Sequence, residues 1–236
     1  IFSCYSRLYN VDLRECGGAL DTFPTFQSFF TRPLVEGCRP VDRRAHIVSP
    51  CDGTIVTSGM VDNADGRFEA VKGVYYNLSD LLGDQAQTFL TKRTAPSWWP
   101  FSGNKTNVHY VTIYLAPGDY HRFHSPADMT ITSCDQREGM KLPVSPSFIT
   151  HIAPDTLRLN SRALILSQTN GVAVVPVGAL NVSSIDVDAV AGSGGVVKKG
   201  DLLGQFKLGS TIMLFFTADS DISVPNGPIK MGQRIH

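Results

Sequence analysis

Short runs of β-branched and aromatic residues, each bounded by glycine or proline, recur along the chain from about residue 46 onward. Val, Ile, Thr and Tyr favour extended backbone, whereas Gly and Pro favour turns, so the pattern predicts short strands. We expect them at 46–58, 108–115, 129–134, 163–169, 172–177, 184–190 and 211–217. The fold class predicted is α+β and β-rich, with mainly antiparallel sheets in a sandwich-like or barrel-like core and a few short helices.

Helical patterns are confined to two short segments. Phenylalanines recur at helical spacing within 22–32, where Thr22 can cap the first turn, and this predicts a core-facing helix in an N-terminal arm of about residues 1–34. A second helical turn is expected at 78–82, ended by Gly83. The stretch 84–107 lacks periodicity and contains Trp98 and Trp99, so we expect a long loop there.

Length and charge limit the classes of function. A chain of 236 residues fits one large domain, and we expect a single domain over 1–236. Lys plus Arg and Asp plus Glu both number 21, so composition gives no support for binding nucleic acid. The 5 cysteines are odd in number and form no CxxC pair, so reduced thiols are expected rather than a disulfide framework or a zinc ribbon.

The hydropathy pattern predicts no membrane-spanning segment in this portion of the protein. The longest apolar run, 172–182, is broken by Pro176, Gly178 and Asn181, well short of the roughly 18 apolar residues that a spanning helix needs. The chain begins at Ile1 rather than at methionine. We therefore expect that any targeting segment or anchor is absent from this chain.

The junction of Gly209 and Ser210 stands at the entrance to the last apolar run, within FKLGSTIML. Glycine has no Cβ to shield its carbonyl, and a serine hydroxyl can attack a carbonyl once a base removes its proton. This pairing predicts that the chain can cut itself between Gly209 and Ser210. The ordinary alternative is a serine that caps a turn before a strand.

Candidate groups to activate Ser210 lie in two other segments. His121 and His124 occur in APGDYHRFHSP, just after an expected strand, and a histidine can accept a hydroxyl proton near neutral pH. Asp52 in SPCDG can orient such a histidine, although Asp-Gly is also a common turn pair. The His-x-x-His spacing also suits metal binding, but the flanking prolines and the missing third ligand argue against a metal site.

Several separated motifs occur in an order that resembles the phosphatidylserine decarboxylases. They are FFTRPL at 29–34, SPCDGTI around Asp52, VKGVYYNLSDLLG at 71–83, YLAPGDYHRFHSPAD around the two histidines, VGALNVSSI at 177–185, FKLGST around Ser210, and IKMGQRI near the end. The likeness runs from about Phe29 to Gly232. The residues around the two histidines look closest to the mitochondrial members, although bacterial members share the pattern. Cys51 stands where many members have alanine or serine.

The resemblance implies self-cleavage by a triad of Asp52, His124 and Ser210, with His124 as base and Asp52 orienting it. Ser210 would attack the carbonyl of Gly209. The products would be a β chain of residues 1–209 and an α chain of residues 210–236, which stay associated. Residue 210 would become a pyruvoyl group, with loss of ammonia. His121 matches a family position used in the later decarboxylation step.

The implied reaction converts phosphatidylserine in membranes to phosphatidylethanolamine through a Schiff base with the pyruvoyl group, with no metal and no pyridoxal phosphate. The family also suggests a homodimer and a mitochondrial or bacterial inner-membrane location. We expect Phe29, Phe30 and the loop with Trp98 and Trp99 to contact the bilayer.

Two other readings of the residues remain open. A serine hydrolase can use Asp52, His124 and Ser210 on external esters, although the GxSxG elbow of one large hydrolase group is missing. A non-catalytic carrier module of the barrel-sandwich kind is suggested by VVKKGDLLGQF and SPCDGTIV. Such a module does not need Ser210.

Overall fold

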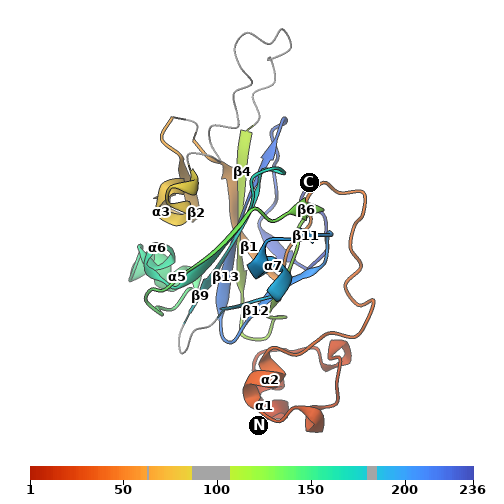
Figure 1. The fold of residues 1–236 in the computed structure, drawn as a ribbon. Coiled ribbons are helices and arrows are strands. Elements are labelled where there is room, and N and C mark those ends of the chain that lie inside the picture. The colour runs from red at the N-terminus through yellow and green to blue at the C-terminus, as the bar shows by residue number, and fades with distance from the viewer. Residues whose placement is uncertain (63, 87–106, 180–184) are drawn as a thin grey trace.

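A large antiparallel sheet runs through the molecule in the computed structural model, which describes residues 1–62, 64–86, 107–179 and 185–236 (Figure 1). Each neighbouring pair of its strands is antiparallel. The strand order is β14 (Gly227–Ile229), β1 (Gly53–Met60), β4 (Asn107–Leu115), β13 (Ser210–Ala218), β9 (Val172–Gly178), β8 (Arg162–Ser167) and β7 (Ser133–Arg137).

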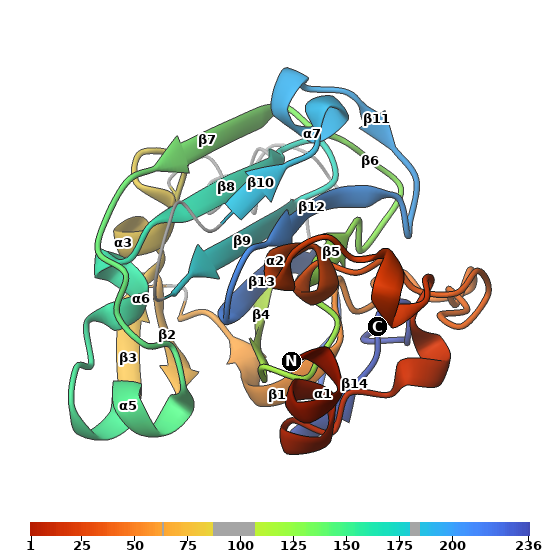
Figure 2. The same ribbon diagram turned by 90° about the horizontal axis from the view of Figure 1, so that it is seen from below.

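Smaller sheets pack around this large one (Figure 2). One has the order β10 (Ile185–Val187), β12 (Leu202–Phe206) and β5 (Arg122–His124), and two ribbons pair β11 (Val196–Val197) with β6 (Met129–Thr130) and β2 (Arg67–Val71) with β3 (Val74–Asn77). The predicted fold class, α+β with mainly antiparallel sheets and few short helices, is confirmed.

The strand β13 is buried on both faces of the large sheet. Side chains alternate along a strand, so Met213 and Phe215 enter one hydrophobic cluster while Ile212, Leu214 and Phe216 enter the other. A strand covered on both faces reads as a continuous apolar run, which explains why the sequence after Ser210 shows no polar alternation.

The helices of the described residues are short. The first four elements form an N-terminal arm, seen at the bottom of Figure 1, and α2 lies beside β5 and β12 in Figure 2. The helical elements are α1 (Phe2–Leu8), η1 (Leu13–Glu15), η2 (Leu20–Thr22), α2 (Phe26–Phe30), α3 (Leu78–Leu82), α5 (Pro146–His151), α6 (Thr156–Leu159) and α7 (Ala189–Ser193).

Some predicted bounds differ from the structure. The helix expected at 22–32 begins only at Phe26, because Thr25 and Ser28 form a capping box there. The strand expected at 46–58 begins only at Gly53, because the preceding residues bond to the C-terminal segment, as in the donation from Ile47 N to His236 O over 2.9 Å. The interval 129–134 holds the end-to-end pieces β6 and β7 instead of one strand.

Other predictions agree more closely. The strands expected at 108–115, 163–169, 172–177 and 211–217 are present with ends moved by at most two residues, and α3 ends at Gly83 as expected, with φ of 60°. The strand expected at 184–190 stops at Val187, and Asp188 then caps α7. Of the loop expected at 84–107, which holds Trp98 and Trp99, only residues 84–86 and 107 are described, and residue 107 is the first of β4.

Candidate active site

Ser210 is the first residue of β13 and is completely buried. It pairs with Leu115 of β4 on one side and with Gly178 of β9 on the other. Within the described ranges its Oγ has no hydrogen-bond partner. A buried hydroxyl without a partner is costly and uncommon, so this atom calls for an explanation other than packing.

Gly209 precedes Ser210 in the link between β12 and β13. A Cβ built on Gly209 meets no atom within 4 Å, and the residue is partly exposed. The peptide bond between the two residues therefore joins an open turn to a buried strand. Its Gly209 carbonyl is attached to a residue with no side chain to block an approach.

His121 is completely buried just before β5. Its backbone carbonyl accepts from Phe206 N over 2.8 Å, which ties it to the end of β12, four residues before Ser210. Nδ1 lies 2.9 Å from Asp119 O, and no residue that the structure describes bonds to Nε2. Burial lowers the pKa of His121 to about 3, so the ring is neutral at physiological pH.

His124 is the last residue of β5 and pairs with Leu202 of β12. Nδ1 lies 2.9 Å from Gly200 O, and Nε2 lies 3.0 Å from the Tyr120 hydroxyl. If Nδ1–H donates to the carbonyl, Nε2 is left as the acceptor for the tyrosine. Burial lowers the pKa of His124, so the ring is neutral at physiological pH and can accept a proton.

Asp52 sits in a buried ion-pair network. Arg39 donates to it from Nε over 2.9 Å and from Nη2 over 2.6 Å, and Lys230 Nζ lies 3.2 Å away. Met231 N donates to Oδ1 over 2.9 Å. Burial favours the protonated acid, but the hydrogen bonds from Arg39 and Met231 and the two positive charges hold the pKa of Asp52 below its ordinary value.

Arg39 also links this network to the N-terminal arm. Its Nη1 and Nη2 donate to the Glu15 carboxylate over 2.9 and 2.6 Å, so one guanidinium joins two carboxylates. Burial disfavours the charge, yet the hydrogen bonds that Arg39 donates to both carboxylates raise its pKa. The arm and the Asp52 turn are thereby held together.

The structure places the four predicted site residues around neighbouring elements, but it does not join all of them. Asp52 and His124 are related through the backbone, because His124 N donates to Pro50 O over 2.8 Å. The side-chain partners of His124 are Gly200 and Tyr120, and those of Asp52 are Arg39, Lys230 and Met231. Direct orientation of His124 by Asp52, as expected from the triad, is not what these contacts show.

Sequence reasoning missed Arg39 and Tyr120, although both lie close to motifs that it used. Arg39 follows FFTRPL by five residues, and Tyr120 precedes His121 directly. Spacing alone gave no sign that an arginine just after the arm would reach Asp52. Arg32 lies within FFTRPL, but no sequence pattern indicates that its side chain is buried beside Gly118 and Asp119.

The expectation that Phe29 and Phe30 contact the bilayer is wrong. Phe29 and Phe30 are almost completely buried, and the Phe30 ring lies 4.0 Å from the His121 ring between centroids. Both of these α2 side chains point into the molecule. The apolar side chains that the arm does expose are Ile1, Leu8, Tyr9, Leu13, Phe26 and Val35.

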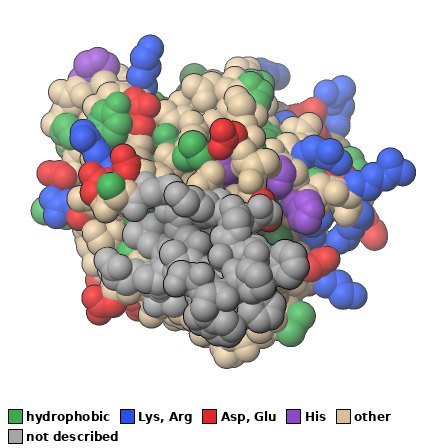
Figure 3. Space-filling model, turned by 90° about the horizontal axis from the view of Figure 1, so that it is seen from above, with side chains coloured by type: hydrophobic (Ala, Val, Ile, Leu, Met, Phe, Trp, Pro, Cys, Tyr) green, Lys and Arg blue, Asp and Glu red, His purple; other side chains and the backbone are tan. Residues whose placement is uncertain are grey.

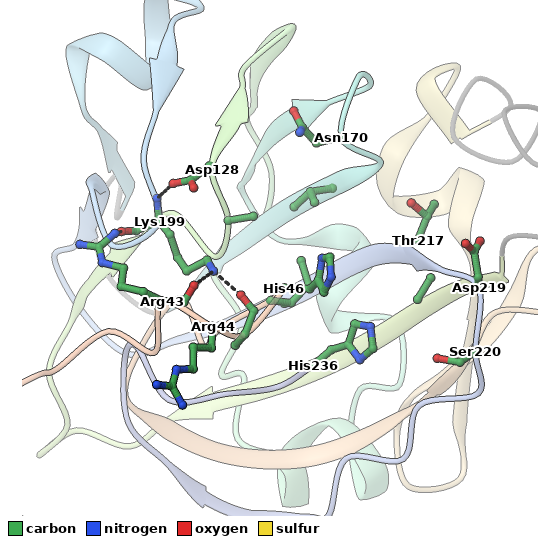
Figure 4. Close-up of a pocket in the computed structure, with 15 residues that line it drawn as sticks. Arg43, Arg44, His46, Asp128, Asn170, Lys199, Thr217, Asp219, Ser220 and His236 are labelled. Atoms are coloured by element: carbon green, nitrogen blue, oxygen red, sulfur yellow. Dashed lines mark hydrogen bonds between the residues drawn. The ribbon is translucent and has the colours of Figure 1, made fainter.

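A polar pocket lies apart from these residues. It has a volume of about 730 Å³ and lies among Arg43, Asp128, Lys199 and His236 (Figure 4). Lys199 Nζ points to the backbone carbonyls of Arg43 and Ala45, and its backbone N donates to Asp128 over 2.7 Å. Lys199 thus has its hydrogen-bond partners within the pocket wall. None of the four predicted site residues lines the pocket.

The described residues hold neither a metal-ligand cluster nor a bilayer-spanning helix. Across the described ranges, no three His, Cys, Asp or Glu side chains gather as a metal site would require. No helix found there has the length and hydropathy to cross a bilayer. The face opposite the arm carries Lys, Arg, Asp and Glu side chains of both signs, spread around its described part (Figure 3).

Known proteins resemble the chain over most of its length. A family model described as phosphatidylserine decarboxylase matches residues 26–236. The phosphatidylserine decarboxylase proenzyme of Myxococcus xanthus is 34% identical over 98% of this chain and 84% of that protein. The proenzyme of Halorhodospira halophila is 35% identical over 96% of the chain and 79% of its own length. The mitochondrial proenzyme of Caenorhabditis elegans is 32% identical over 98% of the chain but only 63% of its own length.

Proposed function

The chain belongs to the phosphatidylserine decarboxylase family and is a decarboxylase; we propose that it cuts itself between Gly209 and Ser210 and then converts phosphatidylserine to phosphatidylethanolamine. The family match favours this function over the serine hydrolase and the carrier module.

The observation that carries the self-cleavage is the buried Ser210 Oγ without a hydrogen-bond partner, next to an unobstructed glycine. Activation of a serine requires a base that is neutral and partly shielded from water. His124 meets this description, because burial lowers its pKa and Tyr120 and Gly200 fix its ring.

The proposed cleavage balances without any added reagent except water. Ser210 Oγ loses its proton to the base and attacks the carbonyl carbon of Gly209, and the amide nitrogen of residue 210 takes a proton as it leaves. The resulting ester breaks at the Oγ–Cβ bond when the α-proton of residue 210 is removed. Gly209 keeps both oxygens as a carboxylate, and residue 210 becomes dehydroalanine. Water then replaces its amine nitrogen, which leaves as ammonia.

The α chain has structural reasons to stay after this cut. β13 is hydrogen-bonded to β4 along its whole length and to β9 along most of it. β14, also in the α chain, pairs with β1, and Lys230 and Met231 bind Asp52. Separation would expose the apolar side chains of β13 to water, which is strongly unfavourable.

The residues around position 210 fit a pyruvoyl group. A buried residue with an unsatisfied oxygen and an open glycine neighbour can be converted without a clash. The pyruvoyl group supplies an electron sink for the α-carbon of the substrate as carbon dioxide leaves. His121 is proposed to face the reacting headgroup, because its Nε2 is buried and free of any partner in the described structure.

Membrane association is supported by the mitochondrial and bacterial relatives and by the exposed apolar side chains of the arm. We propose that the exposed apolar side chains of the arm, rather than the buried Phe29 and Phe30, rest on the bilayer that supplies the substrate. The mitochondrial or bacterial inner membrane and a homodimer remain predictions.

The decarboxylation is tested with phosphatidylserine labelled at the serine carboxyl carbon and presented in liposomes. The purified protein should release the label as carbon dioxide and leave an equal amount of phosphatidylethanolamine. Borohydride, which reduces a ketone, should abolish the release. Carbon dioxide release that survives borohydride would contradict the pyruvoyl mechanism, and no release at all would contradict the proposed function.

A further inference from the structure

Arg32 is a buried arginine just after α2. Its side chain leaves the arm and reaches the loop after β4, where Nη2 donates to Gly118 O over 2.9 Å and to Asp119 O over 3.3 Å. The whole residue is only 3% exposed. Its guanidinium carbon also lies 5.5 Å from the centre of the Phe29 ring.

The Arg32 guanidinium is left largely unsatisfied. Nε and Nη1 are buried and have no hydrogen-bond partner in the described part of the chain. Within the described residues no carboxylate lies at ion-pair distance from it, since the nearby Asp119 carboxylate accepts instead from Ala116 N over 2.8 Å. A buried cation without a counterion is costly, and proteins keep such groups where a ligand supplies the missing charge.

His121 lies beside Arg32, because both bind the same backbone oxygen. His121 Nδ1 is 2.9 Å and Arg32 Nη2 is 3.3 Å from Asp119 O. Like Arg32 Nε and Nη1, His121 Nε2 is buried and has no hydrogen-bond partner among the described residues. Two nitrogen groups with unused hydrogen-bonding capacity therefore lie around one carbonyl, one permanently charged and one neutral.

Arg32 lies between the exposed part of the arm and His121. On one side its neighbour Phe29 meets Tyr5 edge to face at 6.3 Å, and Tyr5 packs against the exposed Phe26 at 4.8 Å between ring centroids. On the other side it shares Asp119 O with His121. In phosphatidylserine the phosphodiester has the same intermediate place, between the acyl chains and the serine that reacts.

We propose that Arg32 binds the phosphodiester of phosphatidylserine through its free Nε–H and Nη1–H groups. The inference rests on the proposed function. A guanidinium is well suited to phosphate oxygens, and the phosphodiester keeps its charge throughout the reaction. The substrate carboxylate, by contrast, loses its charge as carbon dioxide forms. An arginine on the carboxylate would stabilise the ground state over the transition state and slow the reaction.

The test uses soluble dihexanoyl lipids below their micelle concentration, so that membrane binding plays no part. Dihexanoyl phosphatidylethanol carries the phosphodiester but neither the amine nor the carboxylate. 3-Methoxypropionate carries the carboxylate alone. Calorimetry measures the Kd of each probe for the processed wild-type protein and for Arg32→Gln, and mass spectrometry first checks that each protein has been cleaved.

Arg32→Gln should weaken phosphatidylethanol roughly ten- to a hundredfold, as expected for loss of charge-assisted hydrogen bonds, and leave 3-methoxypropionate unchanged. KM for dihexanoyl phosphatidylserine should rise by a similar factor, with kcat nearly constant. Arg32→Lys keeps the charge but not the planar guanidinium, so its Kd for phosphatidylethanol should lie between those of the wild type and Arg32→Gln. It also provides the test if Arg32→Gln does not fold. Arg14→Gln is the matched control, because Arg14 is exposed on the same arm and already paired with Asp12.

Unchanged phosphatidylethanol binding in Arg32→Gln or Arg32→Lys would overturn the assignment, as would a loss confined to 3-methoxypropionate. Because the probe binds without reacting, the result does not depend on turnover. If the wild-type protein binds phosphatidylethanol through Arg32 but releases no carbon dioxide from phosphatidylserine, the proposed function fails while the phosphodiester site stands.

Discussion

Met231 N donates to Asp52 Oδ1 over 2.9 Å, so residues on opposite sides of the Gly209–Ser210 bond are joined at a buried carboxylate. Lys230 Nζ adds a second contact from the same side, at 3.2 Å. Arg39 and, through it, Glu15 complete the network from the N-terminal part of the chain. Asp52 therefore fastens the segment after Ser210 to the N-terminal part of the chain.

Arg39→Leu should destabilise the protein strongly. The change leaves the Asp52 carboxylate buried beside the half-exposed Lys230, and breaking a buried pair costs about 3–5 kcal/mol. Urea denaturation should show a loss of unfolding free energy of this size, and self-cleavage should slow. Arg158→Leu is the control, because Arg158 and Asp155 are both exposed and should contribute about 1 kcal/mol or less. Equal losses in the two variants would show that the Asp52 network does not matter.

The two histidines should separate cleavage from turnover. His124→Gln should slow self-cleavage about 10²- to 10⁴-fold, the usual contribution of a general base. His121→Gln should leave cleavage largely intact but reduce carbon dioxide release, because His121 is tied to Asp119 and Phe206 and has a free Nε2. Gel electrophoresis of newly synthesised protein measures the first effect and labelled carbon dioxide the second. The opposite pattern would reverse the two assignments.

Much of the fold could be predicted because β13 and its neighbours β9 and β4 are apolar runs bounded by turn residues, and such runs indicate buried strands. The segment 46–52 was misjudged because its extended backbone pairs with the C-terminal residues 233–236, a contact that no local pattern encodes. The site was found from motifs, so the roles of its residues came with the resemblance. Arg39, Arg32 and Tyr120 were not recognised, since their importance depends on burial and long-range contacts.

Self-cleavage should persist to lower pH than an ordinary histidine permits. Burial lowers the pKa of His124, and the nearby Arg122 adds to this, while the Gly200 carbonyl and the carboxylates of Asp52 and Asp201 oppose it. A lowered pKa means that the neutral base survives as the pH falls below about 6.5, the ordinary midpoint. The rate of cleavage of newly made protein should thus stay level from pH 8 to 6.5 and decline only below it. A midpoint above 6.5 would argue against neutral His124 as the base.

The exposed apolar side chains of the arm should mediate binding to lipid. Leu8→Ser combined with Phe26→Ser should weaken partition into phosphatidylserine liposomes about tenfold or more, because apolar area is lost from the interface. Activity on soluble dihexanoyl phosphatidylserine should be retained. Ile152→Ser with Val196→Ser serves as the control, since these apolar side chains are also exposed but belong to the end of α5 and to β11, away from the arm (Figure 1). Equal loss in both pairs would exclude the arm as the specific contact.

Denaturing mass spectrometry of the freshly purified protein shows whether Ser210 is consumed to make the catalytic group. We expect two fragments, residues 1–209 ending in the Gly209 carboxylate and residues 210–236 beginning with a pyruvoyl group in place of serine. Ser210→Ala should remain one chain. A wild-type protein that releases carbon dioxide from phosphatidylserine while its chain stays intact would contradict the account.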